Sequence, residues 1–193
     1  VKLPEATHLI LSDGMGSGVK ANVLATLTSE IIATLLRQQV SLPEIIDTVI
    51  RTLPVDKERR IAYATFSILT VNHADHHFRV VNFDNPAPIF IHNGKFIILE
   101  TKEEKIGGKR VTTSSGNLGM GDFIGLLSDG VLHAAPGNKM DLGWNWQAVG
   151  CYLEDLFASK ALSGGKIYSA HSLVNSLTTV TNQRYHFEPG DDA

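Results

Sequence analysis

The amino-acid sequence predicts an α+β domain, in which mainly antiparallel sheets occupy the centre and helices pack outside them. Three observations support this class: a short apolar run followed by helical spacing near the start, a series of short strand-like runs in the middle, and renewed helical patterning near the end. The 193 residues are the size of one ordinary globular domain, so we expect a single domain over residues 1–193.

The first third of the chain predicts one strand and two helices. Residues 8–12 (HLILS) form a short apolar run that ends in a glycine-rich loop at 13–18. Apolar residues at near-helical spacing then predict a long helix over 19–39. A second helix is expected from Ser41 to about Leu53, because a hydroxyl cap precedes a proline and a glutamate in the first turn.

The middle of the chain changes to strand-like runs separated by turns. We expect strands over 63–72, 78–83, 89–92, 95–101, 111–115 and 122–127. Asn93-Gly94 indicates a hairpin, since both residues tolerate positive φ. Helical patterning returns over about 144–157 and 165–180.

Composition limits the classes of partner and compartment. A net charge of -3 argues against nucleic acid or an anionic membrane as the main partner. Cys151 is the single cysteine, which excludes a disulfide framework and favours a reducing, cytoplasmic setting. No apolar run approaches the roughly 18–20 residues that span a bilayer. Both ends of the chain look abrupt, so we expect flanking sequence beyond them.

Ser-Asp-Gly occurs twice, each time after an apolar run. The two copies place Asp13 and Asp129 at predicted strand ends, and a third acidic pair, Asp191-Asp192, follows a Pro-Gly turn. Carboxylates on separate loops at one end of a sheet would supply the oxygen ligands that Mg²⁺ and Mn²⁺ prefer. An isolated Asp-Gly is usually only a turn, and from spacing alone a metal site and simple turns remain equally open.

Four segments in the same order resemble the SpoIIE-type branch of the metal-dependent protein phosphatases (PPM family). They are LSDGMGSG at 11–18, ATFSIL at 64–69, GDFIGLLSDGV at 121–131 and GDDA at 190–193. This resemblance covers nearly the whole chain. It implies the PPM fold, a central β-sandwich of mainly antiparallel strands flanked by helices on both sides.

The resemblance also implies a site with two divalent cations, Mn²⁺ or Mg²⁺. The bridging carboxylate and the carbonyl ligand of the first motif fall on Asp13 and Gly14, and further metal ligands fall on Asp129 and Asp191. Asp13 and Asp129 are then the catalytic candidates. The family pattern also has an upstream Gly-Asp, absent from residues 1–12, and a threonine and closing strand after the Asp-Asp pair.

The activity that the resemblance implies is hydrolysis of phosphoserine or phosphothreonine on a protein. Two metal ions would activate a water for in-line attack on phosphorus. The sequence has no Gly-x-Ser-x-Gly element that would supply a serine nucleophile. SpoIIE-type phosphatases commonly act on small STAS-domain regulators of sigma factors or of stressosome complexes, so such a phosphoprotein is the expected partner.

Two other functions remain as alternatives. A non-catalytic relative would keep the fold as a regulatory or scaffolding protein. A dinucleotide-binding module would use the G-x-G-x-x-A pattern from Gly16 to Ala21, but Asp13 would repel a pyrophosphate there.

Several histidines are conspicuous without belonging to these motifs. His73, His76 and His77 could bind a transition metal, although a polar turn between two strands is the favoured interpretation. His133 could donate a proton to the leaving oxygen, or it could be structural. We expect Asp84-Asn85-Pro86 to form a structural turn.

Replacing Asp13 should damage activity more than any other single change. Asp13→Asn is expected to lower the rate of p-nitrophenyl phosphate hydrolysis with Mn²⁺ further than Asp129→Asn does, because only Asp13 is expected to contact both metal ions. Equal losses in the two variants would contradict the bridging role.

Overall fold

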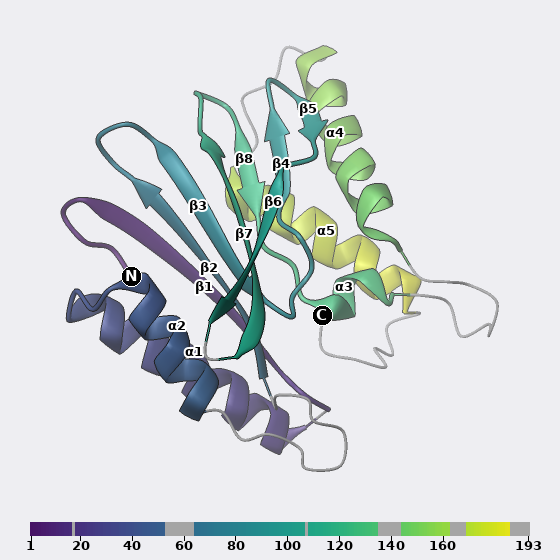
Figure 1. Ribbon diagram of the computed structural model, residues 1–193. Helices are drawn as coiled ribbons and strands as arrows, with labels where there is room; N and C mark the ends of the chain where they lie inside the picture. Colours follow the sequence, from purple (N-terminus) through teal and green to yellow (C-terminus); the bar gives the residue numbers. More distant parts are fainter. Residues whose placement is uncertain (17, 53–63, 107, 135–143, 163–168, 186–193) are drawn as a thin grey trace. The chain divides into compact units, whose positions relative to one another are not determined.

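The computed structural model describes residues 1–16, 18–52, 64–106, 108–134, 144–162 and 169–185 (Figure 1). The chain divides into two compact units. Unit 1 comprises Val1–Asn85 and Leu99–Asn117, and unit 2 comprises Pro86–Ile98 and Leu118–Ala193. The expectation of one domain over 1–193 stays a prediction.

Unit 1 contains a five-stranded antiparallel sheet. Its strands are β1 (Ala6–Gly14), β2 (Ala64–Asn72), β3 (His77–Phe83), β6 (Thr101–Ile106) and β7 (Lys109–Asn117), in the order β1-β2-β3-β7-β6. The register pairs Asp13 with Thr65 and Gly14 with Ala64. Asp13 is therefore the second-last residue of β1 and does not belong to the loop that follows the strand.

Two helices cover one face of this sheet, α1 (Val19–Arg37) and α2 (Leu42–Thr52). Figure 1 shows them side by side within unit 1. The shared core includes the fully buried rings of Phe66 and Phe83, which stack with centroids 5.2 Å apart. Burying a side chain of this size stabilises a fold by about 1.5–3 kcal/mol, so these two rings hold neighbouring strands under the helices.

Gly14 is the point of closest approach between β1 and α1. A Cβ at Gly14 would overlap the backbone carbonyl of Ala21, in the first turn of the helix. Ala21 is itself buried. Only glycine allows the helix to pack so closely on the strand end.

The expectation about apolar stretches needs correction at α1. By length and composition, this helix is apolar enough to cross a membrane. Threonine, serine and alanine separate its larger apolar residues, so no long apolar run is visible in the sequence. Its buried residues, such as Ile32 and Leu36, pack into the core of unit 1, and length and composition alone do not make a helix a membrane span.

In its described residues, unit 2 has a three-stranded antiparallel sheet and three helices. The strands are β4 (Ile89–His92), β5 (Lys95–Ile97) and β8 (Phe123–Gly125), in the order β5-β4-β8, and the helices are α3 (Asp129–Leu132), α4 (Trp146–Leu162) and α5 (Ala170–Arg184). The predicted hairpin at Asn93-Gly94 is present, with φ of 50° and 75° at these residues. Ile89, Ile91, Val149, Leu153 and Leu173 are among the buried residues of its core.

Helix α4 lies close to β5 because Gly150 leaves room for the ring of Phe96. The Glu154 carboxylate accepts hydrogen bonds from Lys95 Nζ and from the Phe96 backbone N–H, each at 2.8 Å. The hydrogen bond from Lys95 is the main reason that the pKa of Glu154 is lowered. The indole of Trp146 donates to the Ala87 carbonyl at 2.8 Å, which fixes the start of the helix.

The predicted strand over 95–101 is wrong at its centre. The structure has β5 ending at Ile97 and a separate strand, β6, beginning at Thr101 in the other unit. Five of the six β6 residues are exposed and four are charged, so β6 lacks the apolar alternation that predicts a strand.

Gly14→Ala should lower the free energy of unfolding of the metal-free protein by about 3 kcal/mol, because the new methyl group meets backbone that cannot move aside. Urea unfolding measures the difference. Gly16→Ala is the control: its Cβ would meet nothing within 4 Å, and only its φ of +91° is costly. That cost is about 1 kcal/mol. Equal losses in the two variants would contradict the collision.

Candidate active site

The first predicted ligand, Asp13, is half-buried at the end of β1 in unit 1. Its backbone is fixed on one side by pairing with Thr65 in β2. The preceding Ser12 hydroxyl donates to the Thr65 carbonyl at 3.0 Å. On the other side, the close contact of Gly14 with α1 sets where the strand ends. The carboxylate of Asp13 and the carbonyl of Gly14 thus come from a rigid part of unit 1.

Asn85 ties the turn after β3 to the strand beside Asp13. Its Oδ1 accepts a hydrogen bond from the Thr65 hydroxyl at 2.5 Å, and its Nδ2 donates to the Ser67 hydroxyl at 3.0 Å. The preceding Asp84 has a φ of 56°, a left-handed conformation that aspartate tolerates in turns. The turn expected at 84–86 is therefore a structural one, and Asn85 supports the cross-strand neighbour of Asp13.

The second predicted ligand, Asp129, lies in unit 2 as the first residue of the short helix α3. Its side chain is 55% exposed, and the His133 ring nitrogen Nδ1 lies 4.0 Å from its carboxylate. This distance is too long for a hydrogen bond, so the two proposed roles of His133 stay open. The next residue, Gly130, is buried, and its carbonyl accepts a hydrogen bond from the Tyr185 hydroxyl at 2.6 Å.

The predicted ligands are divided between the two units and a segment outside the described residues. Asp13 and Gly14 belong to unit 1, Asp129 belongs to unit 2, and Asp191 lies outside the described residues. Within the described ranges, no group of three or more histidine, cysteine, aspartate or glutamate residues could hold a metal ion. The donors nevertheless fit a hard divalent cation, since all are carboxylate or carbonyl oxygens. Their convergence stays a prediction.

The histidines at the β2–β3 turn have a structural explanation. His73 contacts the Thr7 hydroxyl through Nε2 and the Pro4 carbonyl through Nδ1, each at 2.9 Å. His76 has a φ of 56° in the exposed turn. These contacts agree with a polar turn, and His73 is already bound on both ring nitrogens.

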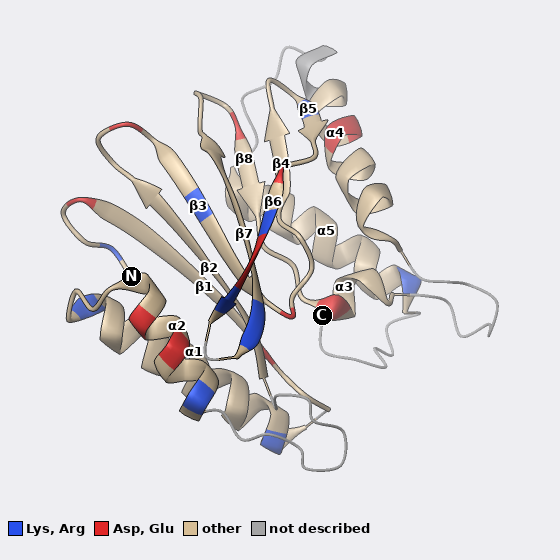
Figure 2. Cartoon of the chain, in the orientation of Figure 1, with Lys and Arg blue, Asp and Glu red and all other residues tan. Residues whose placement is uncertain are grey.

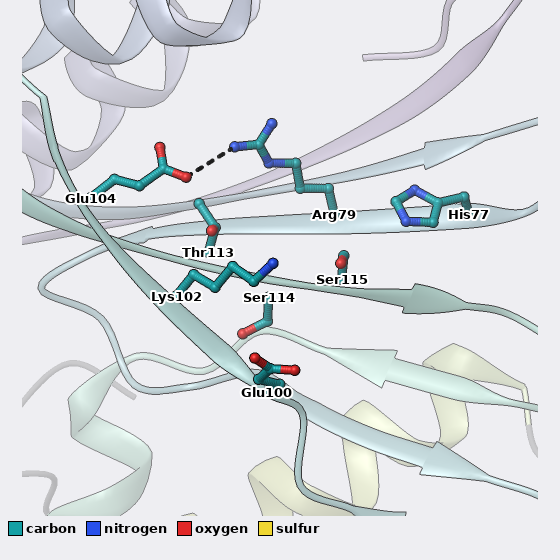
Figure 3. A pocket seen from close by; sticks show the side chains of 8 residues that line it. All are labelled: His77, Arg79, Glu100, Lys102, Glu104, Thr113, Ser114 and Ser115. Carbon is teal, nitrogen blue, oxygen red and sulfur yellow. Dashed lines mark ion pairs between the residues drawn. The ribbon is translucent and has the colours of Figure 1, made fainter.

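A hollow of about 360 Å³ lies on unit 1 over β3, β7 and β6 (Figure 3). It is lined by His77, Arg79, Glu100, Lys102, Glu104, Thr113, Ser114 and Ser115. Arg79 and Glu104 approach to 3.9 Å, and both side chains are nearly half exposed, so their ion pair contributes little. Figure 2 shows acidic and basic residues next to each other along β6. The hollow thus presents both signs of charge, and it includes none of the predicted ligands.

Asp122 anchors the segment that leads to Asp129. Its side chain is 1% exposed and accepts hydrogen bonds from His92 Nδ1 at 2.7 Å, from the Gly119 N–H at 2.7 Å and from the Asn93 N–H at 3.0 Å. Burial alone would raise the pKa of Asp122. The hydrogen bonds outweigh this effect and hold the pKa below its usual value, His92 being the strongest of the three.

The sequence did not predict the contacts of Asn85, Asp122 and Tyr185, although it did predict a structural turn at Asn85. Asp122 lies within a motif quoted for the family resemblance, but its partner His92 is 30 residues away. Tyr185 is 55 residues from Gly130. No periodicity or motif connects such pairs, so only the fold reveals them.

Comparisons with known proteins agree with the resemblance. A family model described as Stage II sporulation protein E (SpoIIE) matches residues 4–192. Among solved structures, the PP2C phosphatase domain of SpoIIE from Bacillus subtilis, with a fragment of its regulatory domain, is 18% identical with a TM-score of 0.72. The match covers 97% of this chain and 51% of that one, so the chain spans about half the length of that relative. No curated protein matched.

Two further structures share the fold. RsbX in complex with magnesium is 20% identical with a TM-score of 0.60, over 95% of this chain and 78% of that one. The RsbU and RsbW domains of Rv1364c from Mycobacterium tuberculosis are 21% identical with a TM-score of 0.62, over 81% of this chain and 43% of that one. These likenesses confirm the predicted fold class of helices and antiparallel sheets.

Asp122→Asn should destabilise the protein in a pH-dependent way. Because folding lowers the pKa of Asp122, its carboxylate contributes stability above the unfolded-state pKa of about 3.9, and this is lost as the pH falls through the folded-state value. At pH 7 the variant should lose about 1–3 kcal/mol in urea unfolding. The difference in free energy of unfolding between the variant and the parent protein should become smaller below about pH 4.

The exposed Asp155, on α4, offers the matched control. Asp155→Asn should leave the free energy of unfolding nearly unchanged both at pH 7 and below about pH 4. If Asp122→Asn lowers the free energy of unfolding by the same amount at every pH, the charge of the Asp122 carboxylate is not what stabilises the turn.

Proposed function

Because the chain belongs to the SpoIIE family, we propose that it is a metal-dependent phosphatase acting on phosphoserine or phosphothreonine of a regulatory protein. The observation that carries this proposal is the first Ser-Asp-Gly motif. It places a carboxylate and a glycine carbonyl on a strand end held between β2 and α1. Likeness to structures of phosphatase domains over nearly the whole chain supports the same function.

Asp13, the Gly14 carbonyl, Asp129 and Asp191 would hold Mg²⁺ or Mn²⁺. When bound, two such cations supply Lewis-acid chemistry: they make water a nucleophile near neutral pH and neutralise charge on the phosphoryl oxygens. The chain's own contribution is to fix the carboxylates. Asp13 is held by strand pairing, and Asp129 follows a segment anchored through Asp122.

The substrate is proposed from the family resemblance. A STAS-domain regulator of a sigma factor or of a stressosome, phosphorylated on serine or threonine, is the class that SpoIIE-type phosphatases commonly accept. Such a partner would place the protein in the cytoplasm. A screen of purified phosphorylated STAS proteins, with release of inorganic phosphate as the readout, would identify the partner.

Hydrolysis of p-nitrophenyl phosphate should require Mn²⁺ or Mg²⁺ and should stop in EDTA. Asp129→Asn should lower the rate by about 100-fold or more, because one metal loses a charged ligand. Asp155→Asn should leave the rate unchanged, since Asp155 is an exposed carboxylate outside the motifs.

Two results would contradict the proposal. Activity that survives EDTA would exclude the metal mechanism. A well-folded protein without activity on this ester or on any phosphorylated STAS protein would favour the non-catalytic alternative.

A further inference from the structure

The hydroxyl of Tyr185 makes a contact that the family motifs do not include. Tyr185 is the residue directly after α5, and its OH donates to the Gly130 carbonyl at 2.6 Å in a partly buried position. Gly130 follows Asp129 in the chain. Figure 1 shows the C-terminal end of α5 beside α3 within unit 2. The contact therefore joins the end of one helix to the turn that carries a predicted metal ligand.

Helix α3 is too short to fix its own orientation. It has four residues. The N–H of His133, the residue after the helix, donates a hydrogen bond to the Asp129 carbonyl at 2.9 Å. A single turn of helix is unstable alone and depends on tertiary contacts. The buried Gly130 and its bond to Tyr185 provide such a contact one residue from Asp129.

Tyr185 is presented by a helix that is itself well anchored. Leu173 of α5 is buried in the core of unit 2. The Ser169 side chain caps the start of the helix by accepting the Ser172 N–H at 3.1 Å. Near its end, the Arg184 guanidinium lies 4.9 Å from the centroid of the Trp144 ring. Tyr185 thus follows a helix that packs into the core of unit 2, and its hydroxyl can restrain the turn that contains Asp129.

We infer that Tyr185 is a positioning residue for the metal ligand Asp129, an inference that rests on the proposed function. A ligand must be held to about 0.5 Å for full effect, and the Asp129 side chain is 55% exposed with few restraints of its own. The chain that leaves Tyr185 reaches Asp191 six residues later. One hydroxyl therefore connects the turn of one predicted ligand with the start of the segment that carries another.

Tyr185→Phe tests the inference with Mn²⁺ alone as the probe. The variant removes the hydroxyl and keeps the ring. Calorimetric titration should show Mn²⁺ bound about 3- to 10-fold more weakly than by the parent protein, as expected for the loss of one hydrogen bond. If Tyr185 acts only through the position of Asp129, hydrolysis of p-nitrophenyl phosphate should return to the parent rate at saturating Mn²⁺.

Thr179→Val is the matched control. It also removes one hydroxyl hydrogen bond, which the exposed Thr179 of α5 donates to the Asn175 carbonyl at 2.7 Å. Its variant should bind Mn²⁺ with unchanged affinity. Parent-like affinity in Tyr185→Phe, in a parent protein that does bind Mn²⁺, would overturn the role of Tyr185 alone. A parent protein that binds no Mn²⁺ would overturn the proposed function and this inference together.

A second measurement needs no substitution. Hydrogen exchange of the parent protein should slow on adding Mg²⁺ in residues 128–133 and, through the Tyr185 hydroxyl, in residues 180–185. Protection of the first segment without the second would overturn the link, even if Tyr185→Phe failed to fold.

Discussion

The close approach of Gly14 to Ala21 is the constraint on which unit 1 depends. The strand that ends in Asp13 and the helix that follows it are joined by only a few residues, so their separation is set where they touch. A side chain at position 14 would push the helix off the strand. The same residue offers its carbonyl at the predicted metal site, so packing and chemistry impose the same requirement on one position.

Two of the predicted ligands, Asp13 and Asp129, have a chain neighbour or a cross-strand neighbour that is held by a residue of their own unit. In unit 1, Asn85 fixes Thr65, the cross-strand neighbour of Asp13. In unit 2, Tyr185 fixes the carbonyl next to Asp129. These supports are neutral hydrogen bonds. They can restrain a carboxylate without adding a charge that would compete with a bound cation.

The elements predicted from the sequence are those with a strong apolar pattern. Helices α1 and α2 and strands β2 and β3 bury one face or both. The spacing of their apolar residues therefore predicts them. Strand β6 was missed because its residues are charged and exposed, and its pairing with β7 is what defines it. The ligand residues were predicted from motifs and family resemblance. The supports of Asp13 and Asp129 could not be, because they depend on contacts between distant segments.

Strand β6 is the last strand of its sheet, and its sequence has a consequence for the protein at high concentration. An edge strand presents backbone N–H and C=O groups that another chain can pair with. Lys102, Glu103, Glu104 and Lys105 follow one another along this edge strand and are exposed on its two faces. An incoming strand would have to bury these charges, so the edge resists aggregation. The same lack of apolar residues that hides β6 in the sequence protects the folded chain.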